Sequence, residues 1–236
     1  MLLTNAQMEA ASNLRSAYED LDKADRALKG LPYSLVRKNI GRYSYLYEMT
    51  DRNGNGRSLG PWSEQAENEL EDYRRTKIEL KCQKAAARSN LERASRMYRR
   101  AGLPLLENRV GEFFRRMEDR RIFDHDAKIV GRYSTFATRL ADYLLPSLPF
   151  DLKIELAWRQ MAGSIFSRAV ADALRSIDPS FIVYSSYPLK ARSSSGLELE
   201  ILPWQGLDWV SPTTTIAVCW DGRLAPISAA TMPEED

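Results

Sequence analysis

Apolar residues recur at helical spacing through much of the first half of the chain. In residues 5–29 they fall three or four positions apart, Asn5 can cap the start, and a glycine and a proline follow the end. A second helical pattern runs unbroken over residues 63–100, about 57 Å at 1.5 Å per residue. Acidic residues in its opening turns suit the positive end of the helix dipole. A third, shorter helix is predicted for residues 105–121.

Residues 33–60 follow a different pattern, in which apolar and polar positions alternate. Tyr43, Tyr45 and Tyr47 occupy every second position, and glycine-containing turns interrupt the segment near residues 41 and 53–56. Period-two alternation between such turns predicts a small antiparallel β-ribbon. We expect its tyrosines to pack against the long helix.

From residue 123 onward, short apolar runs alternate with helical patterns. They predict helices at 132–145 and 160–176, strands at 126–131, 151–157, 181–187 and 196–203, and short strands near 214–219 and 222–226. A shift in composition near residue 122 divides the chain into a helical, basic region, 1–122, and a mixed region, 123–236. The predicted fold class is therefore α+β: a mixed sheet with helices, preceded by a helical region that carries a β-hairpin at 33–60.

Composition narrows the class of protein. The 236 residues are 44% apolar and 28% charged, which is typical of a globular protein with a sizeable core. The sequence has no apolar run long enough to span a membrane, and its polar first residues are not typical of a secretory signal, so we expect neither a secretory signal nor a membrane partner. Cys82 and Cys219 are far apart in the chain, which favours reduced thiols and a cytoplasmic location. The single histidine, His125, excludes a histidine-rich metal site.

The net charge of +2 conceals an uneven distribution. Residues 73–121 contain 15 lysines and arginines against 6 acidic residues, so the rest of the chain is acidic. This pattern indicates a polyanion surface, with RNA as the favoured partner, or a solvated, salt-bridged helix face. Arginines near the end of the long helix could follow a phosphate backbone: Arg93, Arg96, Arg99 and Arg100. A helix as long as 63–100 must also lie against a protein partner, a second copy or nucleic acid.

One predicted strand carries charged residues at alternate positions. Asp151, Lys153 and Glu155 share a face of strand 151–157, because residues two apart on a strand point to the same side. Carboxylates on such a face can bind Mg²⁺ for phosphoryl transfer, in which paired ions lie about 3.5–4 Å apart.

A second acidic strand completes the arrangement. Glu198 and Glu200 share a face of strand 196–203, and the two acidic faces meet if the strands are neighbours. Gly131 opens the helix at 132–145, where a glycine turn lets backbone N–H groups approach phosphates. The sequence therefore predicts a site for Mg²⁺ and a nucleoside triphosphate (NTP).

Several further segments carry a resemblance to a known family. They are Arg42-Tyr43-Ser44-Tyr45-Leu46-Tyr47, Leu59-Gly60-Pro61, Val130-Gly131, Leu174-Arg175-Ser176-Ile177-Asp178-Pro179-Ser180-Phe181, and Gly196-Leu197-Glu198-Leu199-Glu200-Ile201-Leu202-Pro203. Through these motifs, residues 30–225 resemble a bacterial group of nucleotidyltransferase-fold proteins. The string ending in Phe181 and the Glu200 strand are fairly specific when they occur together.

This resemblance implies a nucleotidyltransferase-like mixed sheet. It also implies Mg²⁺-dependent transfer of a nucleoside monophosphate to an acceptor hydroxyl on RNA, a protein or a small molecule. Some relatives are toxins paired with antitoxins. On the matching positions, Asp151 would be the first metal ligand and Glu200 the third carboxylate. Gly131, Arg132 and Ser134 would lie near the triphosphate, although Arg132 stands where the family usually has a small residue.

The chain departs from the family at Lys153, which stands where the second acid is expected. Two unit charges 4 Å apart interact by about 4 kcal/mol at an effective dielectric of 20, so this lysine repels Mg²⁺ on that scale. Lys153 is then an ion-pair partner of Asp151 or a phosphate contact. Glu155 can substitute for the missing acid, although it lies about 6.6 Å further along the strand. The metal site is either rebuilt from Asp151, Glu155 and Glu200 or degenerate.

Two functional hypotheses follow. In the first, the chain transfers a nucleoside monophosphate from an NTP to a macromolecular acceptor, with RNA favoured. In the second, the metal site is lost and the fold serves as a nucleic-acid- or protein-binding module. Other motifs have ordinary structural explanations beside functional ones: Asp124-His125-Asp126 as a solvated turn or a metal cluster, and Trp204 with Trp209 as a hydrophobic flap or a base-stacking pair.

Overall fold

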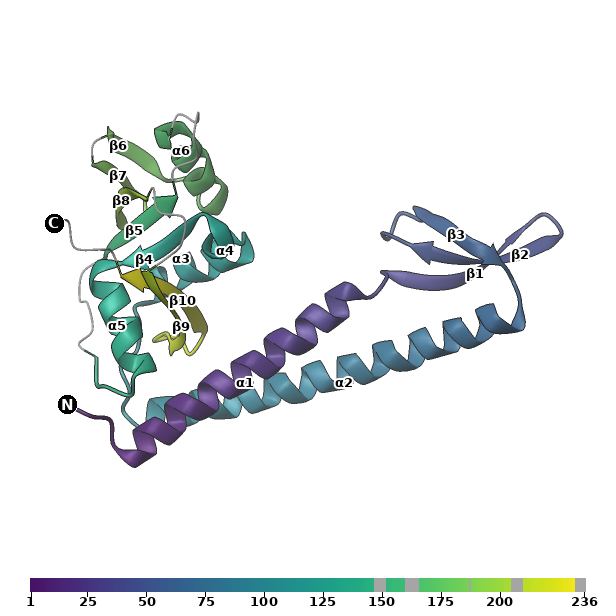
Figure 1. Cartoon of the computed structure of the whole chain (residues 1–236), viewed down its shortest axis with the longest axis horizontal. Coiled ribbons are helices and arrows are strands. Elements are labelled where there is room, and N and C mark those ends of the chain that lie inside the picture. Colours follow the sequence, from purple (N-terminus) through teal and green to yellow (C-terminus); the bar gives the residue numbers. More distant parts are fainter. Residues whose placement is uncertain (147–151, 160–165, 187, 205–209, 232–236) are drawn as a thin grey trace. The chain divides into compact units, whose positions relative to one another are not determined.

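The computed structural model describes residues 1–146, 152–159, 166–186, 188–204 and 210–231 (Figure 1). Its contacts define two compact units: Ser16–Arg93, and Met1–Arg15 together with Ala94–Asp236. These units divide the chain at other residues than the composition shift near residue 122. Two helices, α1 (Asn5–Gly30) and α2 (Glu64–Arg100), contribute residues to both units.

The two long helices agree with the sequence prediction. Ser63 caps α2, since its hydroxyl accepts a hydrogen bond from the backbone N–H of Ala66 at 3.2 Å. Within Ser16–Arg93, Lys84 of α2 forms an ion pair with Asp25 of α1. Asp25 also pairs with Lys29 one turn further along α1, at 2.7 Å.

The predicted ribbon is a three-stranded antiparallel sheet of β1 (Ser34–Ile40), β2 (Tyr43–Met49) and β3 (Gly56–Pro61), in that spatial order. One face forms a small core in which Leu35 and Leu46 pack with Ala66 and Leu70 of α2.

The tyrosines of β2 do not belong to this core. Because side chains alternate along a strand, Tyr43, Tyr45 and Tyr47 lie on the opposite face from Leu46. The prediction that these three tyrosines pack against the long helix is therefore wrong. Tyr33, just before β1, does contact α2, because the Lys77 ammonium lies 5.8 Å from its ring centroid.

The larger unit contains a seven-stranded mixed sheet in the order β6-β7-β8-β5-β4-β10-β9. Two neighbouring pairs are parallel, β5 with β8 and β4 with β10, and the other pairs are antiparallel. The strands are β4 (Ala127–Val130), β5 (Lys153–Arg159), β6 (Ile182–Ser186), β7 (Leu189–Arg192), β8 (Glu198–Trp204), β9 (Val210–Val218) and β10 (Leu224–Thr231).

Three of these strands differ from the sequence prediction. The short strand β7 was not expected, because it spans four residues just before the polar residues 193–196. Strands β9 and β10 are longer than predicted, since their pairing extends from Leu224 opposite Val218 to Thr231 opposite Val210.

Four shorter helices accompany the sheet: α3 (Asn108–Asp119), α4 (Ile122–His125), α5 (Gly131–Ala141) and α6 (Phe166–Ile177). The Glu107 carboxylate caps α3 by accepting N–H bonds from Arg109 and Val110. Asp124 and His125, which the sequence placed in a solvated turn or a metal cluster, belong to the four-residue helix α4.

Aromatic side chains from several helices build the core of the larger unit. Phe114 of α3 is fully buried, and its ring centroid lies 5.6 Å from that of Tyr133 of α5 and 6.4 Å from that of Phe123 of α4. The edge-to-face geometry of these pairs is favourable for aromatic rings. Helices α3 and α5 both also contact β10.

The helices and mixed sheet confirm the predicted α+β class. None of the helices in the described part of the chain is both long enough and apolar enough to cross a membrane.

Candidate functional site

Strand register brings the predicted carboxylates together on the seven-stranded sheet. Strands β5 and β8 are parallel neighbours, and Glu155 is the register partner of Glu200. On the outer sides of this pair, Val130 of β4 lies opposite Glu155, and Lys190 of β7 lies opposite Glu200. Register partners share a sheet face, so these four residues form one row across four strands.

Lys153 lies against both carboxylates of this row. Its Nζ is 2.5 Å from Oε2 of Glu200 and 3.6 Å from Oε1 of Glu155. Lys190 provides a second cation, with Nζ 3.9 Å from the same oxygen of Glu200. Two lysines and two glutamates thus form a mutually neutralising cluster, which we call the Lys153 cluster.

The titration of the cluster follows from its hydrogen bonds. The Lys153 ammonium donates to Glu200 and lowers the pKa of that carboxyl below its ordinary value. The same hydrogen bond raises the pKa of Lys153. Both groups therefore stay charged across the neutral pH range, and their attraction holds the side chains together.

Gly131 lies next to the cluster, as the sequence predicted. Its φ of +64° is a backbone conformation that favours glycine, and a Cβ at this position would lie 1.5 Å from Oε2 of Glu155. The Glu155 carboxylate therefore fills the space beside the first residue of α5. A carboxylate is favourable there, because the N-terminal end of a helix carries partial positive charge.

The other predicted phosphate-site residues lie in different surroundings. Ser134 is buried and its hydroxyl donates to the backbone carbonyl of Ala230 at 2.9 Å, so it contributes to packing between α5 and β10. Arg132 is exposed on the first turn of α5. Glu198, on the same strand face as Glu200, pairs with Arg192 of β7. Asp151, the predicted first metal ligand, lies outside the described residues.

The described residues do not fit a bound Mg²⁺ in this arrangement. Of the predicted ligands, Glu155 and Glu200 are described, and a lysine ammonium lies against both. A divalent cation would have to displace that ammonium, because like charges so close repel strongly. The described part of the chain also contains no group of three or more histidine, cysteine, aspartate or glutamate residues placed to hold a metal ion.

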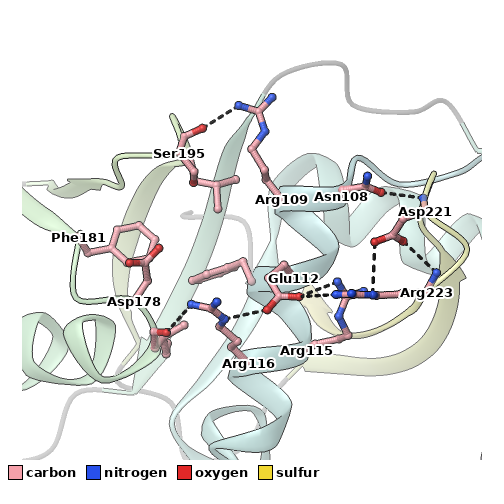
Figure 2. Close-up of a pocket in the computed structure, with 13 residues that line it drawn as sticks. Asn108, Arg109, Glu112, Arg115, Arg116, Asp178, Phe181, Ser195, Asp221 and Arg223 are labelled. Atoms are coloured by element: carbon pink, nitrogen blue, oxygen red, sulfur yellow. Dashed lines mark hydrogen bonds and ion pairs between the residues drawn. The ribbon is translucent and has the colours of Figure 1, made fainter.

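A cavity of about 350 Å³ lies elsewhere in the larger unit, between α3, the end of α6 and two loops (Figure 2). Apolar side chains, among them Phe113 and Phe181, line part of its wall. Four arginines also line it, three from α3 and its start and one from the β9–β10 turn: Arg109, Arg115, Arg116 and Arg223.

The cavity arginines are engaged with the protein itself. Arg109 donates to the carbonyl of Ser195 at 2.7 Å, Arg116 to that of Ile177 at 3.0 Å, and Arg115 to that of Leu224 at 3.0 Å. Each bond ties α3 to a different segment of the chain. The network thus holds the larger unit together.

Glu112 lies at the centre of this network (Figure 2). It accepts from Arg115 at 2.8 Å and from Arg116 at 2.9 Å, and these bonds, that from Arg115 foremost, lower its pKa. Since Glu112 also lies 3.7 Å from Arg223, it offsets positive charge that an anionic ligand would otherwise meet.

The sequence did not predict this cavity. Arg115 and Arg116 stood out as part of the basic segment, but nothing near Arg223 in sequence connects it to α3. The spacing of Arg109 and Arg116, seven residues apart, places them on one helix face and was the available signal.

Comparison of the chain with protein-family models, curated proteins and solved structures finds no match.

Proposed function

We propose that this chain is a nucleic-acid-binding module, with RNA as its ligand, built on a nucleotidyltransferase-like arrangement whose carboxylates no longer serve a metal. The observation that carries the proposal is the 2.5 Å contact between Lys153 Nζ and Glu200 Oε2. Lys153 stands where an acidic ligand is expected, and its charge satisfies the carboxylates that would otherwise attract Mg²⁺.

Glu155 adds a second argument for binding without transfer. Its carboxylate lies against Gly131, at the helix start where the triphosphate would be cradled. A phosphate entering this place would meet a fixed negative charge. The charged residues of the site thus neutralise one another, and an NTP would gain little binding free energy there.

The basic segment supports nucleic acid as the ligand. Within Ser16–Arg93, positions 74, 78, 81, 85 and 88 of α2 are all exposed and follow one helix face. They hold Arg74, Lys81 and Arg88 with the neutral Ile78 and Ala85 between them. Basic side chains at this spacing can follow a phosphate backbone without base contacts.

Salt dependence of RNA binding tests this proposal. Fluorescence anisotropy of a labelled RNA, titrated with the full chain at several salt concentrations, gives the slope of log affinity against log salt. Neutralising Arg74, Lys81 and Arg88 to glutamine is expected to reduce the magnitude of that slope by about 2, at roughly 0.7 per phosphate contact on a single strand. Arg26→Gln, on α1 and ion-paired with Asp22, is the control and should leave the slope unchanged. A triple variant with the wild-type slope would overturn the role of this face.

Nucleotidyl transfer is the rival proposal. The register pairing of Glu155 with Glu200 beside Gly131 favours it, because the predicted residues do lie together. Transfer requires both carboxylates to be released from Lys153. It predicts Mg²⁺-dependent labelling of RNA or of the protein by a labelled NTP, and loss of that labelling in Asp151→Ala.

A further inference from the structure

The three-stranded sheet has one covered face and one face rich in tyrosine. Leu35 and Leu46 point into the small core against α2. On the opposite face, β2 places Tyr43, Tyr45 and Tyr47 two residues apart, a rise of about 6.8 Å between neighbours. We call this second face the tyrosine face.

Neighbouring strands complete the tyrosine face. Lys38 of β1 is the register partner of Tyr45, and Ile40 is that of Tyr43, so both lie on the same side of the sheet as the tyrosines. The Lys38 ammonium lies 5.0 Å from the ring centroid of Tyr47. Tyr43 exposes 70% of its surface and Ile40 exposes 47%. Aromatic rings and a cation are therefore presented together on this face.

The acidic residues of the ribbon are used elsewhere. Glu48 is the register partner of Leu35, so it lies on the covered face, where it pairs with Arg57 at 2.7 Å. The Asp51 carboxylate accepts backbone N–H bonds from Asn53 and Asn55 and thereby organises the turn between β2 and β3. The tyrosine face thus carries a positive charge from Lys38 and no carboxylate among its strand positions.

One further cation borders the face at the start of β2. Arg42 occupies the exposed turn before Tyr43. Arg52, in the turn after β2, donates to the phenol oxygen of Tyr33 at 3.1 Å and shares that turn with Asp51, so this turn has no net charge. A ligand that crosses β2 would meet stacking rings beside the positive charges of Lys38 and Arg42. This charge distribution complements a polyanion that exposes flat aromatic groups.

We infer that the tyrosine face is a platform for a single-stranded segment of RNA, whose bases stack on Tyr43 and Tyr45 while Lys38 and Arg42 contact phosphates. The inference rests on the proposed nucleic-acid-binding function and adds a second surface to the α2 face, one specific for single strands. Stacking on aromatic rings tolerates any sequence, because every base offers a π-face. Bases of a duplex are already paired and stacked on one another, so few of them are free to stack on these tyrosines.

Anisotropy with two labelled probes tests the inference on the full chain. The probes are a single-stranded RNA of about 12 nucleotides, within the site sizes common for such surfaces, and the duplex of the same sequence. Tyr43→Ala should weaken binding of the single strand roughly tenfold, while Tyr43→Phe should keep wild-type affinity, because the ring and not the hydroxyl stacks. Duplex affinity should not respond to either variant. Tyr43 is so exposed that both variants should keep the wild-type melting temperature.

The outcomes separate this inference from the proposed function. A wild-type chain that binds neither RNA probe overturns the proposed function, and the platform with it. A chain that binds RNA with equal affinity before and after Tyr43→Ala overturns the platform alone. If light scattering shows a dimer that Tyr43→Ala dissociates, with no change in RNA affinity, the face is a contact between copies and the inference is wrong.

Discussion

The two sheets of this protein use alternating strand positions in opposite ways. On the seven-stranded sheet, Lys153 lies 2.5 Å from Glu200 and 3.6 Å from Glu155, so charges that share a face neutralise one another. On the three-stranded sheet, Tyr43 and its neighbours on β2 share a face that lies away from the core around Leu46. The charged face, which the sequence marked as a metal site, is neutralised by its own residues. The tyrosine face, to which the sequence assigned only a packing role, exposes Tyr43 to solvent.

This contrast distinguishes which residues share a strand face from what that face contacts in the folded protein. Alternation tells which residues share a face, because the strand period is two. It does not tell what that face meets. The decisive information is what each side chain meets, which is the Lys153 ammonium for Glu155 and Glu200 and the exposed Ile40 opposite Tyr43.

Exchanging a covered aromatic residue should have the largest effect. Phe114 is fully buried and packs against Phe113, Phe123 and Tyr133, so Phe114→Ala should lower the free energy of unfolding by about 3–5 kcal/mol. Tyr43→Ala, which removes a ring from the open face, should change it by less than about 0.5 kcal/mol. Urea denaturation measures both. A large loss from Tyr43→Ala would show that the tyrosine face is covered.

Two glycines give an intermediate effect and test the position of Glu155. Gly131 and Gly41 have φ of +64° and +62°, so alanine at either is strained by about 1–2 kcal/mol. Only Gly131→Ala also places a methyl group against Glu155, because Gly41 has open space around its Cβ position. Gly131→Ala should therefore be the more destabilising in urea denaturation. Adding Glu155→Ala should recover the excess, and no recovery would mean that Glu155 lies elsewhere.

The Lys153 cluster should contribute a small, pH-dependent stability. Lys153→Met should lower the free energy of unfolding by about 0.2–1 kcal/mol at pH 7, the usual range for partly exposed ion pairs. Glu200 has a lowered pKa in the folded chain, so its contribution is present above its unfolded pKa and is lost as the pH falls through the folded pKa. Lys153 has a raised pKa, so its contribution is lost only as the pH rises through that value.

The difference between Lys153→Met and the wild type should therefore persist at neutral pH and disappear in acid. Urea denaturation at pH 7 and in acid measures it. Lys190→Met is the matched control and should have the smaller effect, since its ammonium is 3.9 Å from Glu200. A Lys153→Met difference that is unchanged in acid would contradict the ion pair.

Much of the fold could be predicted from local patterns. The long helices follow from apolar spacing and from caps such as Ser63, and the ribbon follows from alternation between glycine turns. Strand β7 was missed because four residues give too short an alternation to recognise. The helical placement of His125 was missed because one helical turn has no periodicity.

The candidate site could be predicted in part. Strand geometry alone predicts that Lys153 and Glu155 share a face. One further assumption, that the two strands are neighbours, predicts that this face meets Glu200. The contact of Lys153 with Glu200 depends on the parallel register of β5 and β8 and on the reach of a long side chain, which alternation does not specify. The network around Glu112 could not be predicted from the sequence, because Arg223 is more than a hundred residues from α3 along the chain.

Label transfer from an NTP tests the central claim most directly. The full chain is incubated with Mg²⁺, a fluorescently labelled RNA strand and each NTP carrying a second, distinct label. Label transferred from the NTP is measured in both RNA and protein, and fluorescence anisotropy records RNA binding in the same mixture. We predict bound RNA and no transferred label, because Lys153 neutralises the carboxylates that a metal would need. Mg²⁺-dependent label that disappears in Asp151→Ala would contradict the account and establish transfer.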